Sequence, residues 1–308
     1  MALTIGNITL SHDAVLGPMA GVSDLGFRSL ARSYGAGLTY TEMISVCGLN
    51  YRNKQTEILT TVAPCETPCA VQLFGHDPED FAKGVRAEVI DKFDIIDINM
   101  GCPVQKVVSR GEGSALMKDP SRAADIVRAV KEGAGSRPVT VKIRLGWDRL
   151  TAPEFALAME RAGADMVTVH GRTRTQFYQG SADWDAIAEV KRAVDIPLVA
   201  NGDVKSADDY RRIKEVTACD GVMIARGAIG HTSIFAEVRG ADVEVDLKKD
   251  FLFQMDMLSK TYSDHVVCNL LKPHLISAVS GRAGAKEYRL KVGAAKTTEE
   301  IKAIIMTL

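Results

Sequence analysis

The chain has 308 residues, of which 46% are hydrophobic and 25% are charged, and its formal net charge at pH 7 is −1. This length allows one large domain and a small one around a full hydrophobic core. No run approaches the roughly 20 apolar residues of a membrane span, and residues 1–15 lack the pattern of a signal peptide. The sequence therefore excludes a membrane-spanning chain and predicts a soluble, cytoplasmic protein.

Eight short runs of apolar, β-forming residues lie between residues 14 and 226, and stretches with helical periodicity separate them. The runs are mostly continuous rather than alternating, as in parallel strands that are covered on both faces. Ser23-Asp24, Asp119-Pro120 and Ser206 can cap intervening helices. The predicted strands cover residues 14–19, 37–43, 69–75, 95–100, 139–145, 166–171, 196–202 and 221–226.

Eight strands that are each followed by a helix predict an α/β fold, a (β/α)8 TIM barrel over residues 1–240. An open doubly wound sheet is the alternative, but its glycine-rich dinucleotide fingerprint is missing after the early strands. After Arg239 the segment "GADVEVD" resembles a linker, and residues 247–308 show helical stretches without a convincing strand. We therefore predict a small, all-helical C-terminal domain at residues 241–308.

The predicted C-terminal domain carries a basic run with a charge of +5. A basic face on a near-neutral protein can bind a polyanionic partner, although it can equally be a solvated helical surface. Against the single acid Glu287, the run contains Lys272, Arg282, Lys286, Arg289, Lys291 and Lys296.

The six cysteines show no regular spacing, and the only close pair is Cys65 and Cys69. This pair lacks the second Cys or His pair of a zinc finger, so we expect reduced thiols and no metal site. Cys102 differs because it follows a predicted strand directly, in "INMGCPVQKV". From this context alone it could serve in packing, bind a metal, form half of a disulfide or act as a reactive thiol.

Polar residues gather where the predicted strands end. Reactive groups of a TIM barrel lie at the carboxyl ends of its strands, so we expect these residues to converge. The glycines beside the last two strands suit a phosphate, because backbone N–H groups can face it there. The residues concerned are Pro18, Met19, Ala20, Glu42, Gln72, Asn99, Cys102, Lys142, Arg144, His170, Arg172, Arg174, Asn201, Gly202, Asp203, Ala225, Arg226 and Gly227.

Lys142 lies within an apolar run, and a buried lysine needs a partner. It could form a Schiff base, stabilise an anion such as a reduced flavin ring, or form a salt bridge with an acid on a neighbouring strand. His170 precedes "GRTR" at a strand end, where a ligand-binding role competes with that of a packed core histidine. Phe177 and Tyr178, in the loop that follows, could stack on a base or anchor the loop.

The motifs "GPMAGVSD", "VQLFG", "DINMGCPVQKV…GSALM", "VKIRLGW", "VHGRTR…YQGSADW", "VANGDV" and "DGVMIARGAIG" together resemble those of the tRNA-dihydrouridine synthases. Each motif is weak alone, but their order and spacing match from about Leu16 to Phe235. The C-terminal region matches only as a helical domain of suitable size. The resemblance implies an FMN-containing barrel that reduces the C5=C6 bond of specific uridines in tRNA, with NADPH as reductant.

The resemblance also implies roles for individual residues. Cys102 would donate the proton to C5 of the uracil, while reduced FMN would give the hydride to C6. A thiol with an ordinary pKa of about 8.5 remains protonated at neutral pH and suits this role. Asn99 would bind the base edge, and Arg172, Arg174, Lys106 and the basic run would contact phosphates. The implied FMN contacts are Pro18, Met19, Ala20, Gln72, Lys142, His170, Asn201, Gly202, Asp203, Ala225 and Arg226.

Two departures from the family pattern bear on RNA docking. His231, Thr232 and Ser233 stand where an Asn-Pro-Trp-like segment is expected, and Lys272-Pro273-His274 replaces an Arg-Lys-His run. The alternative function is an FMN barrel oxidoreductase that acts on a free small molecule, as dihydroorotate dehydrogenase does. A Schiff-base lyase and an RNA-binding module with a vestigial barrel are further alternatives. The helical tail with its basic run favours the tRNA enzyme, which we expect to be a monomer.

Overall fold

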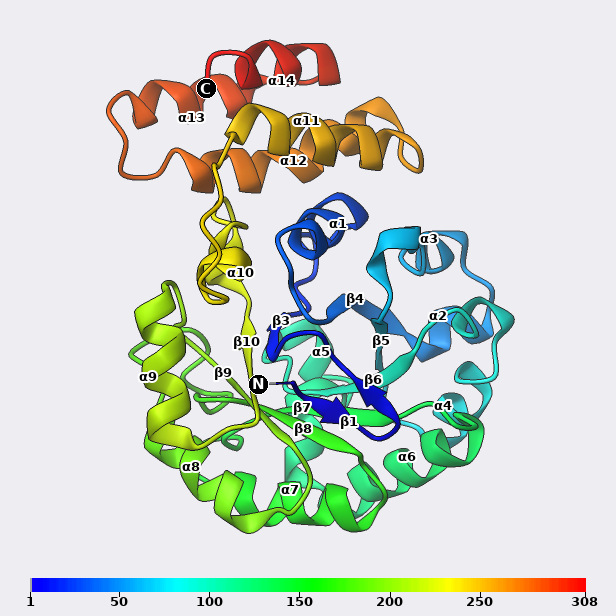
Figure 1. Ribbon diagram of the computed structural model, residues 1–308. Coiled ribbons are helices and arrows are strands. Elements are labelled where there is room, and N and C mark those ends of the chain that lie inside the picture. Colours follow the sequence, from blue (N-terminus) through cyan, green and yellow to red (C-terminus); the bar gives the residue numbers. More distant parts are fainter. Residues whose placement is uncertain (1) are drawn as a thin grey trace.

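The computed structural model describes residues 2–308, and in these residues eight parallel strands form one sheet in the order β3-β10-β9-β8-β7-β6-β5-β4 (Figure 1). Each strand coincides with one of the eight predicted apolar runs, and helices surround the sheet. The strands are β3 (Ala14–Leu16), β4 (Thr39–Ser45), β5 (Cys69–Phe74), β6 (Ile95–Met100), β7 (Val139–Arg144), β8 (Met166–His170), β9 (Leu198–Asn201) and β10 (Gly221–Ile224).

The sheet closes into a barrel between β3 and the chain just before β4. Leu16 N–H donates to the Leu38 carbonyl (2.9 Å), and Gly37 N–H donates to the Ala14 carbonyl (2.8 Å). A Cβ atom at residue 37 would lie 1.9 Å from the His12 carbonyl oxygen, so only glycine permits this approach. The predicted (β/α)8 TIM barrel is confirmed.

The helices around the barrel begin at the expected caps. Asp24, Asp119 and Ser206 each accept a hydrogen bond from a backbone N–H in the first turn of the following helix. The helices are α1 (Leu25–Ser33), α2 (Val46–Asn50), α3 (Lys54–Ile58), α4 (Pro78–Gly84), α5 (Gln105–Val108), α6 (Pro120–Gly133), α7 (Ala152–Arg161), α8 (Trp184–Ala193), α9 (Ala207–Thr217) and α10 (Ile234–Glu237). The 3₁₀ helices are η1 (Pro64–Glu66), η2 (Glu88–Ile90), η3 (Gly113–Lys118) and η4 (Arg226–Ala228).

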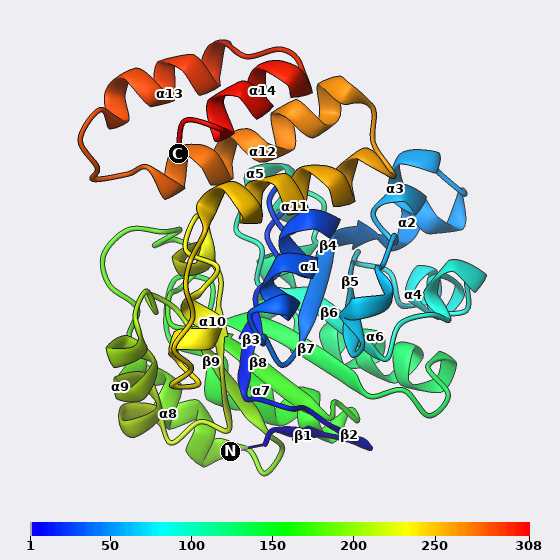
Figure 2. The ribbon, with the colours of Figure 1, turned by 45° about the horizontal axis from the view of Figure 1, so that its top comes forward.

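A short hairpin that the sequence did not predict precedes the barrel. It consists of β1 (Thr4–Ile5) and β2 (Ile8–Thr9), which pair antiparallel. Leu3, Ile5 and Leu10 are buried in one cluster with side chains from the barrel interior, including Tyr40. The hairpin therefore covers the amino-terminal end of the barrel, away from the C-terminal helices (Figure 2).

The chain after the barrel is helical, as expected. The helices here are α11 (Leu247–Ser259), α12 (Asp264–Ala278), α13 (Ala285–Ala294) and α14 (Thr298–Ile305). They bury an apolar cluster that contains Leu258, Leu271 and Ile301 and extends to Leu25 of α1. Figure 2 shows α11 lying on α1. This contact is close, because a Cβ atom at Gly26 of α1 would lie 2.8 Å from the Gln254 carbonyl oxygen of α11. The boundary at residues 240/241 stays a prediction.

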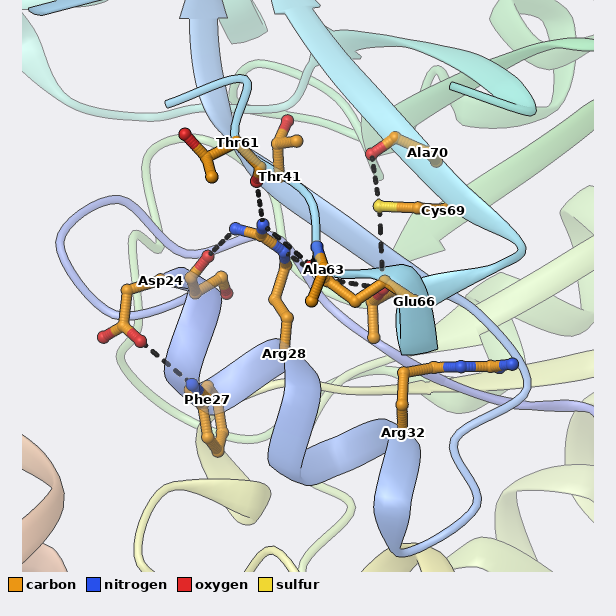
Figure 3. Close-up of polar contacts among 12 residues, drawn as sticks. Asp24, Phe27, Arg28, Arg32, Thr41, Thr61, Ala63, Glu66, Cys69 and Ala70 are labelled. Carbon is orange, nitrogen blue, oxygen red and sulfur yellow. Dashed lines mark hydrogen bonds and ion pairs between the residues drawn. The ribbon is translucent and has the colours of Figure 1, made fainter. Parts of the chain in front are cut away.

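A buried ion pair ties α1 to the segment before β5 (Figure 3). Arg28 Nε lies 2.6 Å from Glu66 Oε1, and both side chains are almost completely buried. The remaining Arg28 donors bond the carbonyls of Ser23 and Thr61, and Glu66 Oε2 accepts from Ala63 N–H. The pair fixes the helix that supports α11. Within residues 2–308, the helices are all too short or too polar to cross a membrane.

Candidate active site

Side chains from neighbouring strands meet at the carboxyl end of the barrel. The strand register places Asn99 opposite Lys142 and His170 opposite Asn201. Asn99 Nδ2 donates to Gln72 Oε1 (2.8 Å), and Lys142 Nζ donates to Asn201 Oδ1 (3.2 Å). All except Lys142 are less than a tenth exposed. The structure thus brings together these five residues, which sequence reasoning assigned to one site.

The electrostatics of this cluster suit an anionic ligand. Burial lowers the pKa of Lys142 to about 8, so its ammonium form persists at neutral pH. Burial and the charges of Lys142 and Arg144 hold the pKa of His170 well below its ordinary value, so its imidazole is neutral. Within the described chain, Asn201 is the only hydrogen-bond acceptor of Lys142. The ammonium group therefore retains donors for a ligand.

A second group of predicted residues lies at the ends of β9 and β10. Gly202 and Asp203 have positive φ angles of 133° and 58°. The Asp203 carboxylate accepts from Arg172 Nη2 (2.7 Å) and lies 3.5 Å from Arg226 Nη2. Although burial opposes ionisation, the hydrogen bond from Arg172 holds the pKa of Asp203 below its usual range. The Arg226 side chain remains 49% exposed, so its cation is accessible to an anion.

The loop after β3 lies beside the ends of β9 and β10. Gly17 N–H donates to the Ile224 carbonyl (2.8 Å), and a Cβ atom at Gly17 would lie 3.0 Å from the Ala225 Cβ. Ser23 shapes the loop by donating to the Gly17 carbonyl and accepting from Met19 N–H. The exposed or partly exposed Pro18, Met19 and Ala20 thereby come next to Ala225.

The Cys102 loop is held by hydrogen bonds on both sides. Cys102 N–H donates to Asn99 Oδ1 (2.9 Å), and its carbonyl accepts from both the N–H and the hydroxyl of Ser114. Gly113 has φ of 60°, and a Cβ atom there would lie 2.9 Å from the Cys102 carbonyl oxygen. The "GSALM" segment therefore braces the partly exposed Cys102.

Burial raises the pKa of the Cys102 thiol above its ordinary value. A hydrogen bond from the Val104 backbone and the charges of Arg144 and Lys142 act in the opposite direction without reversing the shift. Cys102 is therefore a neutral thiol at pH 7, within electrostatic reach of the Lys142 ammonium. This state suits a proton donor better than a nucleophile or a metal ligand.

Two predicted substrate contacts are used inside the protein. Both ends of the Asn99 amide have protein partners, since Oδ1 accepts from the Cys102 loop and Nδ2 bonds Gln72 and Met43 Sδ. Arg172 is only 2% exposed and bonds the Gln179 and Gly180 carbonyls as well as Asp203. Sequence reasoning placed both residues against RNA, whereas the structure places them beneath the surface of the site.

The other predicted RNA contacts lie at the rim. Lys106 is exposed on α5, and Arg174 bonds Gln105 Oε1 (2.8 Å) while its guanidinium lies 4.6 Å from the Trp147 ring centre. Lys118 lies over the same ring, at 4.4 Å. The basic run is outside this cluster, on helices α12 and α13 and the loops that flank α13.

Sequence reasoning missed Asp97 and Thr140, which lie beneath the cluster. Asp97 accepts from Gln72 Nε2 (2.7 Å) and from the Thr140 hydroxyl (2.5 Å), and it is fully buried. The sequence could have indicated Asp97, because an acidic residue inside the apolar run "IIDINM" must find partners when it is buried. Tyr178 also gains a defined place, since its ring lies 4.8 Å from the Arg226 guanidinium and 5.4 Å from that of Arg144.

No group of three or more His, Cys, Asp or Glu side chains capable of holding a metal occurs in residues 2–308. All six cysteines are free thiols. The clustered groups are instead amides, an ammonium, an imidazole and guanidinium groups, which suit an organic anion.

Comparison with solved structures identifies the fold. Morphinone reductase superposes with a TM-score of 0.55 over 79% of this chain and 91% of its own, at 13% identity. Histamine dehydrogenase from Rhizobium sp. 4-9 gives a TM-score of 0.62 at 12% identity, covering 83% of this chain and 50% of its own. At such identities these likenesses show the barrel fold alone.

The sequence comparisons then give the family. The dihydrouridine synthase (Dus) family model matches residues 15–305. A tRNA-dihydrouridine synthase B from Pseudomonas putida is 35% identical over 309 residues, covering 97% of this chain and 91% of its own. A probable tRNA-dihydrouridine synthase from Rickettsia bellii is 44% identical over 239 residues, covering 77% of this chain and 73% of its own. The chain belongs to the dihydrouridine synthase family.

Proposed function

We propose that this protein is a tRNA-dihydrouridine synthase that uses FMN and NADPH to reduce the C5=C6 bond of specific uridines in tRNA. Membership of the family and the names of the relatives from P. putida and R. bellii support the reaction and the RNA substrate. The observation that carries the proposal is Cys102, a neutral, partly exposed thiol on a braced loop beside the polar strand ends.

The side chains at the strand ends fit FMN. Lys142 retains ammonium donors for an electron-rich ring, and the neutral His170 offers a donor and an acceptor. Arg226 would hold the phosphate, with Asp203 positioning its guanidinium. When bound, FMN supplies the hydride that C6 of the uracil accepts, and NADPH is the source of the electrons.

Cys102 completes the reduction by protonating C5. Transfer of the Sγ proton to C5 leaves a thiolate, which the Val104 backbone and the charges of Arg144 and Lys142 stabilise. Solvent then returns the proton. Because burial raises the pKa of Cys102, the thiol is available at neutral pH before each turnover.

The proposal gives Asn99 and Arg172 positioning roles in place of the expected contacts with RNA. Asn99 would hold the Cys102 loop, and Arg172 would hold Asp203 and the loop before α8. Lys106 and Arg174 remain candidates for phosphate contacts at the rim. The target base must leave its stack to reach the site, and this costs least in a tRNA loop.

The test is dihydrouridine formation in tRNA by the purified protein with FMN and NADPH, mapped by position. We expect Cys102→Ala to bind tRNA and retain flavin but to lose product formation by roughly a hundredfold or more, since general acid catalysis contributes this much. Cys47→Ala removes an exposed thiol on α2 and should behave as the wild type.

Full activity of Cys102→Ala would exclude Cys102 as the proton donor. If the wild type leaves tRNA unchanged and reduces a free pyrimidine without RNA, the proposed substrate is wrong and the small-molecule oxidoreductase is the better description. A position map of dihydrouridine in tRNA from cells with and without the gene would identify the target uridine.

A further inference from the structure

A chain of hydrogen bonds leads from the Cys102 loop to the barrel interior. Cys102 N–H donates to Asn99 Oδ1 (2.9 Å), Asn99 Nδ2 to Gln72 Oε1 (2.8 Å), and Gln72 Nε2 to Asp97 Oδ2 (2.7 Å). The Thr140 hydroxyl donates to the other Asp97 oxygen (2.5 Å). We call these four side chains, Asn99, Gln72, Asp97 and Thr140, the Asp97 relay.

Every donor in the Asp97 relay points the same way, toward the carboxylate. The backbone N–H of Cys102 can only donate, so Asn99 must present its oxygen to the loop and its NH₂ group to Gln72. Gln72 must then present its oxygen to Asn99 and its NH₂ group to Asp97. Both orientations are consistent only if Asp97 accepts on the oxygen that faces Gln72, and an ionised carboxylate is the strongest acceptor at that place.

We propose that Asp97 is a positioning residue for Cys102, whose carboxylate fixes the orientation of the Gln72 and Asn99 amides and thereby holds the loop that carries the thiol. Asp97 is fully buried and touches neither the rim nor the solvent, so it acts through the relay. A proton on the Asp97 oxygen that faces Gln72 would meet another donor, so it would go to the other oxygen, where the Thr140 hydroxyl can turn to accept it. Gln72 Nε2 would then donate to a neutral acid, which is a weaker acceptor than a carboxylate.

The surroundings of Asp97 make this change of protonation accessible near neutral pH. Burial raises the pKa of Asp97 to about 7, although the hydrogen bonds from Thr140 and Gln72 and the charge of Lys142 oppose the shift. The charged or titratable groups that face it are Lys142 on β7 and Tyr40 on β4. Lys142 is an ammonium and Tyr40 is neutral at this pH, because burial raises its pKa. The relay therefore ends on a carboxylate above about pH 7 and weakens below it.

Amide hydrogen exchange at Gly101 and Cys102 tests the proposal directly, because both N–H groups donate to Asn99 Oδ1. Thr140→Val removes one donor to the carboxylate without changing the side-chain shape, and Asp97→Leu removes the acceptor. At equal pH, near 7, we expect both variants to exchange these two amides roughly tenfold faster than the full-length wild type. In the wild type, their protection relative to unstructured reference amides should fall as the pH drops below about 7.

Two matched controls separate the relay from general destabilisation. Thr140→Ser keeps the hydroxyl and should restore wild-type protection. Thr168→Val removes another fully buried barrel hydroxyl, on β8, that makes no hydrogen bond to the relay, and it should leave both amides protected. Unchanged exchange in Thr140→Val and Asp97→Leu would overturn the proposal. Equal acceleration at the β7 amides would also overturn it, since Asp97 would then only support the fold.

The inference rests on the proposed function for its consequence in catalysis, but hydrogen exchange needs neither RNA nor NADPH. Inactive protein with the expected exchange pattern would refute the function and keep the relay. In an active enzyme, Thr140→Val should lower kcat for tRNA by roughly tenfold and leave KM unchanged, because Asp97 positions the proton donor and not the RNA. It should also move the acidic limb of the pH profile to higher pH, since the carboxylate has lost a donor. An unmoved limb would contradict the relay.

Discussion

Lys142 carries a charge at the centre of the polar cluster, and its pKa of about 8 gives the proposed reaction a basic limb. Burial sets this lowered pKa, so the ammonium form prevails below about pH 8 and loses its proton as the pH rises further. If the ammonium stabilises negative charge on the reduced cofactor, we expect turnover to fall as the pH increases through about 8. Initial rates across this range would measure the effect.

Lys142→Met is the corresponding variant, because it keeps the apolar stem and removes the charge. Lys142→Met should turn over more slowly at every pH, and its rate should not fall as the pH increases through about 8. Lys83→Met, on α4, is a suitable control, since Lys83 is exposed and makes no contact with the cluster. A limb that persists in Lys142→Met would assign it to another group, and Cys102 would be the next candidate.

At the residue scale, the sequence predicts those site members that lie at or beyond the middle of an apolar run. Gln72, Lys142 and Asn201 were recognised in this way, and they do converge. Asp97 escaped because it lies earlier in its strand, among apolar neighbours. The burial of Arg172 could not be foreseen, because it depends on the path of the loop that bonds its guanidinium. The use of FMN and NADPH and the monomeric state stay predictions.

At the element scale, the Arg28–Glu66 pair connects α1 with η1 and so supports the seat of α11 (Figure 3). We expect Glu66→Gln to lower the free energy of unfolding by about 3–5 kcal/mol, because it leaves a buried guanidinium without its counter-charge. Denaturant unfolding would measure this loss. Asp125→Asn breaks an exposed pair with Arg128 on α6 and should cost less than about 1 kcal/mol. Equal costs for the two variants would contradict the structural role of the buried pair.

Most helices and strands could be predicted from the sequence. Nearly continuous apolar runs between helix caps predicted all eight barrel strands, because strands buried on both faces carry few polar residues. The β1–β2 hairpin was missed, since strands of two residues are too short for any periodicity. Barrel closure depends on the close approach of Gly37 to His12, which spacing alone does not reveal.

At the scale of the whole molecule, the barrel and the C-terminal helices divide the proposed work between chemistry and RNA docking. Lys286 and Arg289 lie exposed on α13. We expect reversal of both charges, Lys286→Glu with Arg289→Glu, to weaken tRNA binding and to flatten the dependence of log Kd on log salt concentration, because fewer counterions are released. Binding isotherms at several salt concentrations would measure both effects. Arg128→Glu, on α6, serves as control, and equal weakening by it would place docking elsewhere.

The β1–β2 hairpin has a consequence for the order in which the two substrates bind. Leu3, Ile5 and Leu10 fill the amino-terminal end of the barrel. Substrates can therefore reach the proposed flavin only from the carboxyl end, where the polar side chains lie. The nicotinamide that brings electrons and the uridine that receives them would then have to bind at the same face of the ring one after the other. Double-reciprocal plots of rate against NADPH, at a series of fixed tRNA concentrations, should therefore be parallel. Intersecting lines would mean that NADPH and tRNA bind at the same time.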